Sequence, residues 1–164
     1  MYAQANLAAL YQEGDGVAKD PVEALRWYRK AADQGYAYAQ NQLGWIYQNG
    51  EGVAKNPTEA IKWYLLAADQ NEAAAQNNLG RMYQDGDGVP ENFAEAAKWF
   101  RKAAEQGSAE AQVSLGYLYQ SGQGVTESAI EAEKWFRKAL ANPEADADTK
   151  KLAQEALTEM GKNP

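Results

Sequence analysis

Four glutamates recur along the chain at a spacing of 36 residues, and their carboxylates are the groups with which this sequence could perform acid–base chemistry. They are Glu23, Glu59, Glu95 and Glu131. Each stands three residues before an Arg or a Lys, which is the spacing of an ion pair on one helix face. Because four identical sites spread evenly along a chain cannot converge on one substrate, we expect these glutamates to be structural and predict no catalytic residue.

Glycine-rich segments are the second feature that could bind a ligand. The pattern Gly-x-Gly-Val begins at Gly14, Gly50, Gly86 and Gly122. Its spacing differs from that of nucleotide-binding loops, and the acidic residues within it would repel phosphate. The segment 85–88 resembles the start of a calcium loop, but Ala96 stands where such a loop needs its last Glu. We therefore predict turns at these segments, with no metal and no cofactor.

Composition restricts the chemistry further. The 164 residues include no His and no Cys, which removes the commonest metal ligand, the commonest general base near neutral pH and any disulfide. The net charge of −7 repels phosphate backbones and anionic lipid, so nucleic acid and membrane are poor partners. No apolar run approaches the length of a spanning helix, and the first residues lack the pattern of a signal peptide. We expect a cytoplasmic protein, or a periplasmic or secreted one if a leader has been removed.

The elements that position these residues follow from an internal repeat. Leu recurs at Leu7, Leu43, Leu79 and Leu115, and constant Tyr and Trp residues recur at the same interval of 36. The chain thus divides into repeats 1–36, 37–72, 73–108 and 109–144, followed by residues 145–164. Twelve of the 36 repeat positions are identical in all four copies, which separates what the scaffold needs from what varies. We predict a single solenoid domain over residues 1–164.

Each repeat is predicted to hold two helices. In the second repeat, the apolar stripe of the first helix consists of Ala39, Leu43, Ile46 and Tyr47. Glycines on or beside this stripe would let a neighbouring helix approach closely, and they are Gly44, Gly80 and Gly116, with Ala8 in the first copy. The abundance of Ala and the scarcity of Val and Ile favour an all-α fold.

The second helix of each repeat begins with a recognisable cap. N-cap residue types stand at Asp20, Asn56, Asn92 and Ser128, and the glutamate three positions later is typical of a reciprocal capping box. The buried stripe is predicted at Ala60, Trp63, Tyr64, Ala67 and Ala68. Residues 146–162 are predicted to form a capping helix with an apolar face of Leu152, Ala153, Ala156, Leu157 and Met160.

The third repeat carries the whole pattern, AAAQNNLGRMYQDGDGVPENFAEAAKWFRKAAEQG. This pattern resembles the Sel1-like repeat family, a relative of the tetratricopeptide repeat, over 144 of the 164 residues. The resemblance implies an α/α right-handed superhelix in which the first helices line a concave groove and the second helices face outward. It also implies a role as an adaptor or scaffold that gathers other proteins. Some cysteine-rich members tie the two helices of a repeat with a disulfide, and this chain has no cysteine to do so.

One repeat position varies between large side chains inside an otherwise constant helix. Position 9 holds Ala9, Trp45, Arg81 and Tyr117, and aromatic and Arg side chains are enriched at binding hot spots. By resemblance to tetratricopeptide repeats, the groove-facing residues are Tyr38, Asn41, Trp45, Gln48, Asn77, Asn78, Arg81, Gln84, Tyr117 and Gln120. We expect the two aromatic residues of position 9 to act as apolar anchors, Arg81 as a charged selector and the asparagines as readers of a peptide backbone. The glutamines are constant between copies, which fits a structural hydrogen bond as well as a ligand contact.

The sequence therefore predicts a non-catalytic protein–protein interaction module that binds a protein or peptide in this groove. A first alternative is a hydrolase of cell-wall or β-lactam-like substrates, as proposed for cysteine-rich relatives. A second is an engineered or excised repeat module without a native ligand. We expect a monomer, although exposed apolar groups around Leu10 in the uncapped first repeat would permit end-to-end self-association. The plainer interpretation of the groove face is a set of exposed polar residues with incidental aromatic ones.

Overall fold

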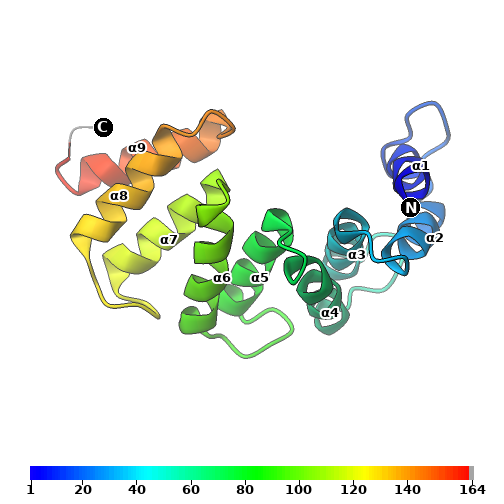
Figure 1. Ribbon diagram of the computed structural model, residues 1–164, viewed down its shortest axis with the longest axis horizontal. Helices are drawn as coiled ribbons and strands as arrows, with labels where there is room; N and C mark the ends of the chain where they lie inside the picture. Colours follow the sequence, from blue (N-terminus) through cyan, green and yellow to red (C-terminus); the bar gives the residue numbers. More distant parts are fainter. Residues whose placement is uncertain (163–164) are drawn as a thin grey trace. The chain divides into compact units, whose positions relative to one another are not determined.

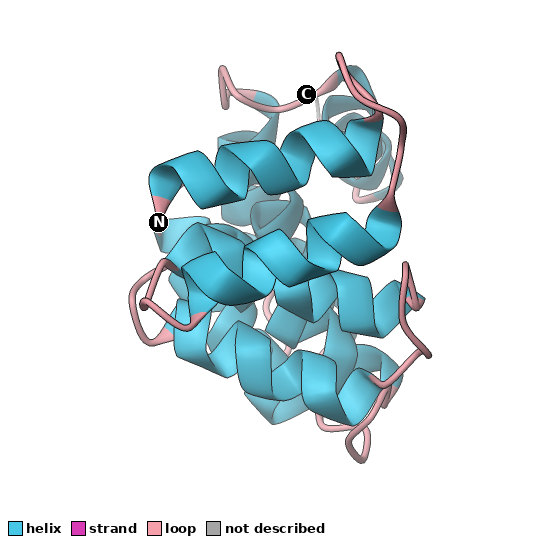
Figure 2. Cartoon of the chain, turned by 90° about the vertical axis from the view of Figure 1, so that its right-hand side faces the viewer, coloured by secondary structure: helices cyan, strands magenta, loops and turns pink. Residues whose placement is uncertain are grey.

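The computed structural model describes residues 1–162 and confirms an all-α solenoid with two helices in each repeat (Figure 1). The helices of the described residues are α1 (Tyr2–Glu13), α2 (Pro21–Ala32), α3 (Ala37–Asn49), α4 (Pro57–Ala68), α5 (Ala73–Asp85), α6 (Phe93–Glu105), α7 (Ala109–Ser121), α8 (Ala129–Leu140) and α9 (Ala147–Glu159). They are joined by loops, and no strand occurs in this range (Figure 2).

The described chain forms two compact units. The N-terminal unit comprises residues 1–75 and 87–89, and the C-terminal unit comprises residues 76–86 together with the chain from residue 90 onward. Within the N-terminal unit, α1 packs on α2, α2 on α3 and α3 on α4. Within the C-terminal unit, α6 packs on α7, α7 on α8 and α8 on α9, while α9 also contacts α7. Each helix is therefore stabilised mainly by its immediate neighbours, as expected for a repeat protein.

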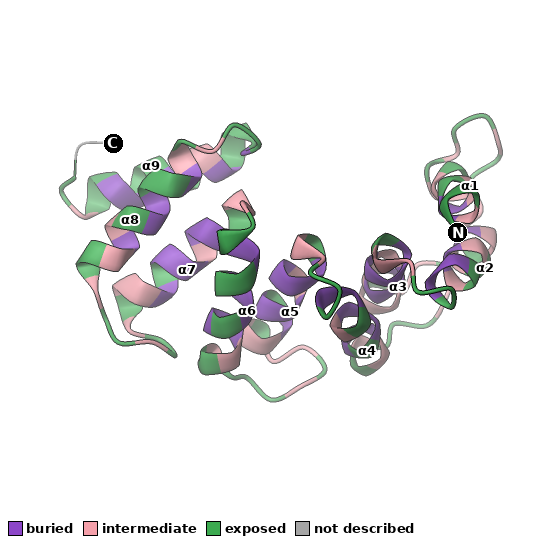
Figure 3. Cartoon of the chain, in the orientation of Figure 1, coloured by how far each residue is buried: buried purple, intermediate pink, exposed green. Residues whose placement is uncertain are grey.

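Buried side chains follow the predicted stripes (Figure 3). The second-helix stripe of the second repeat is buried at all five predicted positions. In the first helices, Leu43, Leu79 and Leu115 are fully buried. Leu10, by contrast, is exposed together with Met1 and Tyr2, as predicted for the apolar groups of the first repeat. The repeat pattern thus marks the core wherever both neighbours of a helix are present.

The second helices begin at the predicted N-caps, but the reciprocal capping box was wrong. Each cap side chain accepts a hydrogen bond of 3.0–3.3 Å from the backbone N–H of the glutamate three residues later. The N–H of the cap residue donates instead to a tyrosine carbonyl of the preceding helix, as in the 2.7 Å bond from Asn56 to Tyr47. Since that donor is already satisfied, the glutamate side chain pairs with the following Arg or Lys at 2.9–3.2 Å.

The last helix, α9, begins where the sequence predicts but turns a different face to the core. Asp146 caps it, accepting a 2.6 Å hydrogen bond from the N–H of Thr149. Ala153, Ala156 and Leu157 are buried as predicted. The prediction that Leu152 lies on the buried face was wrong, because Leu152 is 46% exposed and Thr149 is buried instead. The physical reason is that α9 packs against both α8 and α7, so its buried stripe is set by two neighbours and leaves Leu152 at the edge.

Candidate functional site

The first helices expose repeat position 9 while they bury the positions around it. In α7, Leu115, Gly116 and Leu118 are buried, whereas Tyr117 between them is 37% exposed. Arg81 on α5 is likewise exposed, and Trp45 on α3 is half-buried. In each unit taken by itself, we call the surface formed by position 9 and the other groove residues predicted from the sequence the first-helix face. The exposed parts of Trp45, Arg81 and Tyr117 are therefore available for contact.

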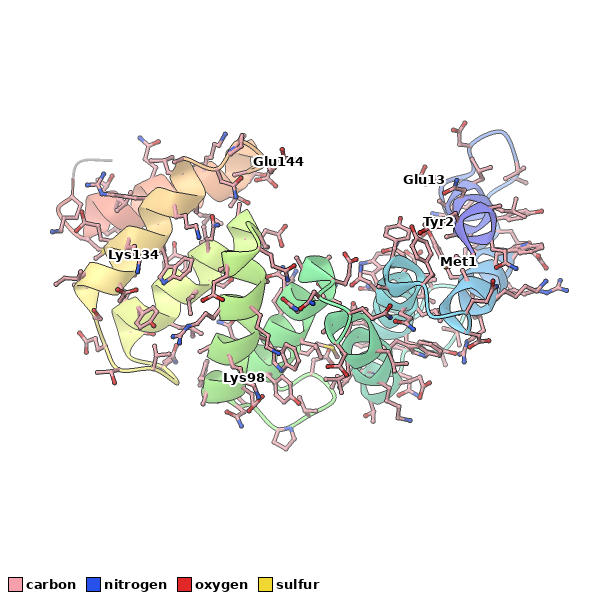
Figure 4. All side chains as sticks on the ribbon, viewed as in Figure 1. Met1, Tyr2, Glu13, Lys98, Lys134 and Glu144 are labelled. Atoms are coloured by element: carbon pink, nitrogen blue, oxygen red, sulfur yellow. The ribbon has the colours of Figure 1, made fainter. Side chains whose placement is uncertain are left out.

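The N-terminal unit contributes aromatic side chains to the first-helix face. Tyr38 on α3 is 39% exposed, and its ring lies 5.9 Å from that of Tyr36 and 6.4 Å from that of Tyr28. Tyr2, labelled in Figure 4, makes an edge contact with Tyr36 at 4.9 Å between ring centroids. Sequence reasoning included Tyr38 but missed Tyr2 and Tyr36. The recurrence of tyrosine at the second position of the first two repeats could have identified Tyr2, whereas no repeated signal marks Tyr36.

Trp45 and Tyr117 contact the core as well as solvent. Trp45 packs against the buried cluster of the N-terminal unit, which includes Leu43 and Ile46. The ring of Tyr117 makes an edge contact with Phe136 at 5.0 Å, and burial raises the pKa of the Tyr117 hydroxyl. Truncation of either side chain to Ala would therefore remove core contacts together with exposed surface.

The asparagines of the first-helix face are more buried than exposed residues that contact a peptide backbone would be. Asn41 and Asn77 are buried and Asn78 is half-buried. The Asn41 side chain donates a long hydrogen bond of 3.4 Å to Oε1 of Gln42. Asn77 donates from Nδ2 to Oε2 of Glu110 on α7 at 2.8 Å. Asn41 and Asn77 therefore have hydrogen-bond partners within the protein.

The constant glutamines have a structural partner only where the second helix carries a tyrosine. The hydroxyl of Tyr64 donates to Oε1 of Gln48 at 2.9 Å, and Tyr28 donates to Gln12 at 3.0 Å. The corresponding residues in the last two repeats are phenylalanines, which have no hydroxyl, so Gln84 and Gln120 cannot make this bond. Both glutamines are half-buried on the first-helix face. The alternative left open by the sequence is thus resolved in favour of a structural bond for Gln48.

The C-terminal unit brings several predicted residues together around a cavity of about 180 Å³. Among the side chains that line it are Asn77, Arg81, Glu110, Val113, Ser114 and Leu152. They come from α5, α7 and α9. Arg81 makes no hydrogen bond and no ion pair within residues 1–162. An unpaired cation, Arg81, and a buried amide, Asn77, therefore line the same cavity.

Cations of the second helices are fixed on aromatic rings, which sequence reasoning missed. The Arg29 guanidinium lies 4.6 Å from the ring of Trp63, and its Nη2 donates to the Tyr47 hydroxyl at 2.6 Å. Lys102 lies 4.2 Å from the ring of Trp99. Each such contact contributes about 0.5–1 kcal/mol when it is exposed. Trp with Lys or Arg three positions later on one helix is the signal that could have predicted the Trp99 contact.

The acidic residues form no metal site in the part of the chain that the structure describes. No three of them gather where they could hold an ion. The repeated glutamates are instead paired with cations, as with Lys98 and Lys134 in Figure 4, and the bond from Lys62 lowers the pKa of Glu59. None of the described helices has the length and apolar character needed to cross a membrane.

Comparison with solved structures shows that the fold of this chain is similar to that of known helical repeat proteins. A protective antigen of uropathogenic Escherichia coli with an SLR fold is 32% identical with a TM-score of 0.84, and the match covers 98% of this chain and 38% of the antigen. A Sel1 repeat protein from Oxalobacter formigenes is 31% identical with a TM-score of 0.83, covering 98% of this chain and 73% of that one. Cysteine rich protein B of Helicobacter pylori, 24% identical over 80% of this chain and 92% of its own, has a TM-score of 0.62 and shares the fold.

The chain thus spans less than half the length of the E. coli antigen. A search of curated proteins found no match. The family model of the Sel1 repeat matches four times, at residues 2–36, 37–72, 73–108 and 109–142. Sel1 repeats form a helical fold that is generally used for protein–protein interaction. With four consecutive repeats that cover most of its length, the chain belongs to the Sel1 repeat family.

Proposed function

We propose that the chain is a non-catalytic interaction module that binds a protein or peptide on its first-helix face. The observation that carries the proposal is the exposure of position 9 within an otherwise buried helix segment, as at Tyr117 between buried neighbours. A residue that only maintained the scaffold would be as constant between copies as Leu115. Trp45, Arg81 and Tyr117 instead differ in size and charge, which suits recognition of different parts of one ligand.

The chemistry of the face supports a protein ligand. Tyr38 and Tyr117 offer aromatic surface with a hydroxyl, and Arg81 offers a guanidinium without a partner in residues 1–162. Aromatic and Arg side chains are the types that dominate binding energy at protein interfaces. Half-buried amides such as Gln84 and Gln120 both donate and accept hydrogen bonds, as a peptide backbone requires.

The acidic residues support binding rather than catalysis. Each repeated glutamate is held by a neighbouring cation on its own helix, and the four copies lie one in each repeat. A general acid or base is most effective when its pKa lies near the working pH. Glu59 has its pKa moved in the opposite direction, downward, by Lys62. We therefore infer a module that works without cofactor, metal or covalent chemistry.

A matched pair of variants tests the proposal. The first-helix variant combines Tyr38→Ser, Arg81→Gln and Tyr117→Ser. The control combines Leu66→Ser and Ile130→Ser, which remove exposed apolar side chains from the second helices α4 and α8. The full chain is panned against a phage-displayed library of random peptides, and each selected peptide is then titrated calorimetrically against both variants. We expect the first-helix variant to lose at least about tenfold in affinity, since each hot-spot residue contributes more than about 1 kcal/mol.

The outcome that would reject the proposal is equal affinity for the wild type and the first-helix variant, or loss of binding in the second-helix control alone. Circular dichroism and the melting temperature of both variants serve as folding controls. The proposal would also be rejected if two searches both failed. In that case the library would yield no enriched peptide, and no protein from a whole-cell extract would bind the wild type better than it binds the first-helix variant.

The exposed apolar side chains on and next to α1 support end-to-end self-association as a secondary property. Met1, Tyr2 and Leu10 are all exposed there. Light scattering over a range of protein concentrations measures the mass of the particles in solution. We propose that this mass is that of a monomer at low concentration. Substitution of Leu10 by Ser should abolish any increase of mass with concentration, whereas an increase that persists in this variant would assign the contact to another surface.

A further inference from the structure

The cavity in the C-terminal unit has an acceptor that the protein leaves unsatisfied. Asn77 is only 5% exposed, and its Nδ2 donates to Glu110. Its Oδ1 is buried and has no hydrogen-bond partner. The other buried side-chain atoms without a partner in residues 1–162 are indole nitrogens, so Oδ1 of Asn77 is the only acceptor among them. Leaving such an acceptor unpaired is unfavourable, and a ligand that donates a hydrogen bond to it would remove that penalty.

The orientation of the Asn77 amide is fixed by its partner. Because a carboxylate only accepts hydrogen bonds, Glu110 must face the NH₂ group and not the oxygen. The oxygen is thereby held as the group that lacks a donor. A peptide N–H is the neutral donor that matches it.

Arg81 supplies the complementary group on the same helix face. It lies four residues after Asn77 on α5, so both side chains project from one side of the helix and line the same cavity. Its guanidinium makes no bond within the described chain, and a peptide carbonyl is an acceptor for it. In an extended chain, the N–H and the C=O of one residue point to the same side, so one residue can engage both groups.

Charge and size indicate what the cavity accepts. One cation, Arg81, and one anion, Glu110, line it, which favours a neutral dipolar group over an ion of either sign. Its volume of about 180 Å³ lies below the roughly 300–1,000 Å³ of sites for small molecules and cofactors. Val113 and Leu152 provide apolar walls. These features fit a single residue with a small apolar side chain.

We propose that this cavity binds one residue of an extended peptide segment of a partner protein. The N–H of that residue donates to Oδ1 of Asn77, its carbonyl accepts from Arg81, and its small apolar side chain lies against Val113 and Leu152. Since Oδ1 is closed to water, binding requires lining side chains to move aside, and Leu152 is a lining residue that is 46% exposed. The inference rests on the proposed function and extends it, because α9 then forms a wall of the binding site as well as covering the last repeat.

The test compares two exposed leucines in the full-length chain. Leu152→Glu introduces a charge at the rim of the cavity, and Leu66→Glu makes the same change at a residue of α4 that is 49% exposed. Peptides selected by the wild type from the phage library are synthesised with acetylated and amidated ends. We expect Leu152→Glu to weaken their binding at least about tenfold and Arg81→Gln to weaken it by a similar factor, while Leu66→Glu leaves it unchanged.

A second measurement keeps the result clear if Leu152→Glu alters folding. In the wild type with labelled Val and Leu methyl groups, the same peptides should shift the signals of Val113 and Leu152 and leave those of Leu66 in place. Peptides that bind Leu152→Glu as tightly as the wild type, or that require a free terminal charge, would overturn the proposal. If such peptides are still lost with Tyr38→Ser, the proposed function stands and only this cavity is rejected. If the library yields no peptide, both are rejected.

Discussion

A methyl group added to Gly80 would lie 2.6 Å from the ring of Phe100, which is fully buried on the neighbouring helix. Gly44 and Gly116 face Tyr64 and Phe136 in the same way. The first helix of each of these repeats therefore meets the second helix across a contact that leaves no room for a side chain. This confirms the close approach that the spacing of these glycines predicts. Ala8 occupies the position in the first repeat, where it is buried.

Gly80→Ala should destabilise the protein although alanine is the better helix former. The added methyl group must displace a buried ring, and overpacking of this kind costs about 1–3 kcal/mol. The helix propensity gained is about 1 kcal/mol, so we expect a net loss of about 1 kcal/mol. Urea unfolding followed by circular dichroism measures it. The comparison variant is Ala8→Gly, which should lose more than about 1 kcal/mol, because it removes a buried methyl group as well as helix propensity. A Gly80→Ala protein more stable than the wild type would contradict the packing argument.

Two loop glycines with the same backbone conformation should respond differently to alanine. Gly16 and Gly52 have φ of 70° and 69°, in the left-handed region that favours glycine. A Cβ at Gly16 meets nothing within 4 Å, whereas one at Gly52 would lie 2.6 Å from the backbone of Pro21. We expect about 1 kcal/mol of destabilisation for Gly16→Ala and about 3 kcal/mol for Gly52→Ala. Thermal and urea unfolding check the difference, and equal losses would show that only the backbone angle matters.

The fold could be predicted because its determinants are local and repeated. Caps such as Asn56, stripes such as the one through Trp63 and glycines such as Gly80 act within one repeat, and four copies make each signal visible. The face of α9 could not be predicted in the same way. Leu152 and Thr149 are both on or near an apolar stripe, and only contact with α7 and α8 decides which of them is buried. Because α9 has no equivalent in the other repeats, comparison between copies does not indicate which of the two residues is buried.

The candidate site could be predicted less completely, since its chemistry depends on contacts between repeats. Variation at position 9 indicated that Arg81 and Tyr117 serve no constant structural role, and both are exposed. The burial of Asn77 depends on Glu110, which lies 33 residues later on another helix. Nothing in the third repeat alone reveals that partner. The stacking of Arg29 on Trp63 likewise joins two repeats, so neither repeat alone reveals it.

Tyr28→Phe should change the dependence of stability on alkaline pH. Burial raises the pKa of Tyr28 to about 12, while an unfolded tyrosine titrates near 10. Between these values the folded state holds the proton and the unfolded state releases it, so this contribution is complete below pH 10 and is lost as the pH rises toward 12. The variant should lose about 1 kcal/mol at neutral pH with the Gln12 hydrogen bond, and its stability should fall less above pH 10.

Urea unfolding between pH 7 and 12 measures this difference. Phenylalanine is suited to the position, because Phe100 and Phe136 occupy it in the last two repeats. Tyr2→Phe is the control, since it removes a hydroxyl from an exposed ring. Parallel stability curves for the wild type and Tyr28→Phe across this range would show that Tyr28 does not carry the alkaline dependence.

Asp146→Asn should remove an acid-dependent contribution to the docking of α9. The Thr149 N–H bonds to the carboxylate and lowers the pKa of Asp146 below its ordinary value of 3.8. A lowered pKa means that the contribution is complete above pH 3.8 and is lost as the pH falls through the folded value. Asparagine also accepts the cap hydrogen bond but has no charge to titrate. We expect the variant to match the wild type at low pH and to be slightly less stable at neutral pH, where the carboxylate also interacts with the helix dipole.

Asp146→Ala separates the hydrogen bond from the charge, because it removes both and should be less stable than Asp146→Asn at neutral pH. Hydrogen exchange of the α9 amides measures the local stability of α9. Global unfolding is less suited, since it also depends on the stability of the repeats. Exchange in α9 of the wild type should accelerate below pH 3.8 relative to α7, after correction for the intrinsic rate, and Asp146→Asn should lack that acceleration. If α9 of Asp146→Asn opened with the same pH dependence as the wild type, the acid sensitivity would have to arise from another carboxylate, and Glu133, whose pKa Lys162 and Arg137 lower, would be the next to replace.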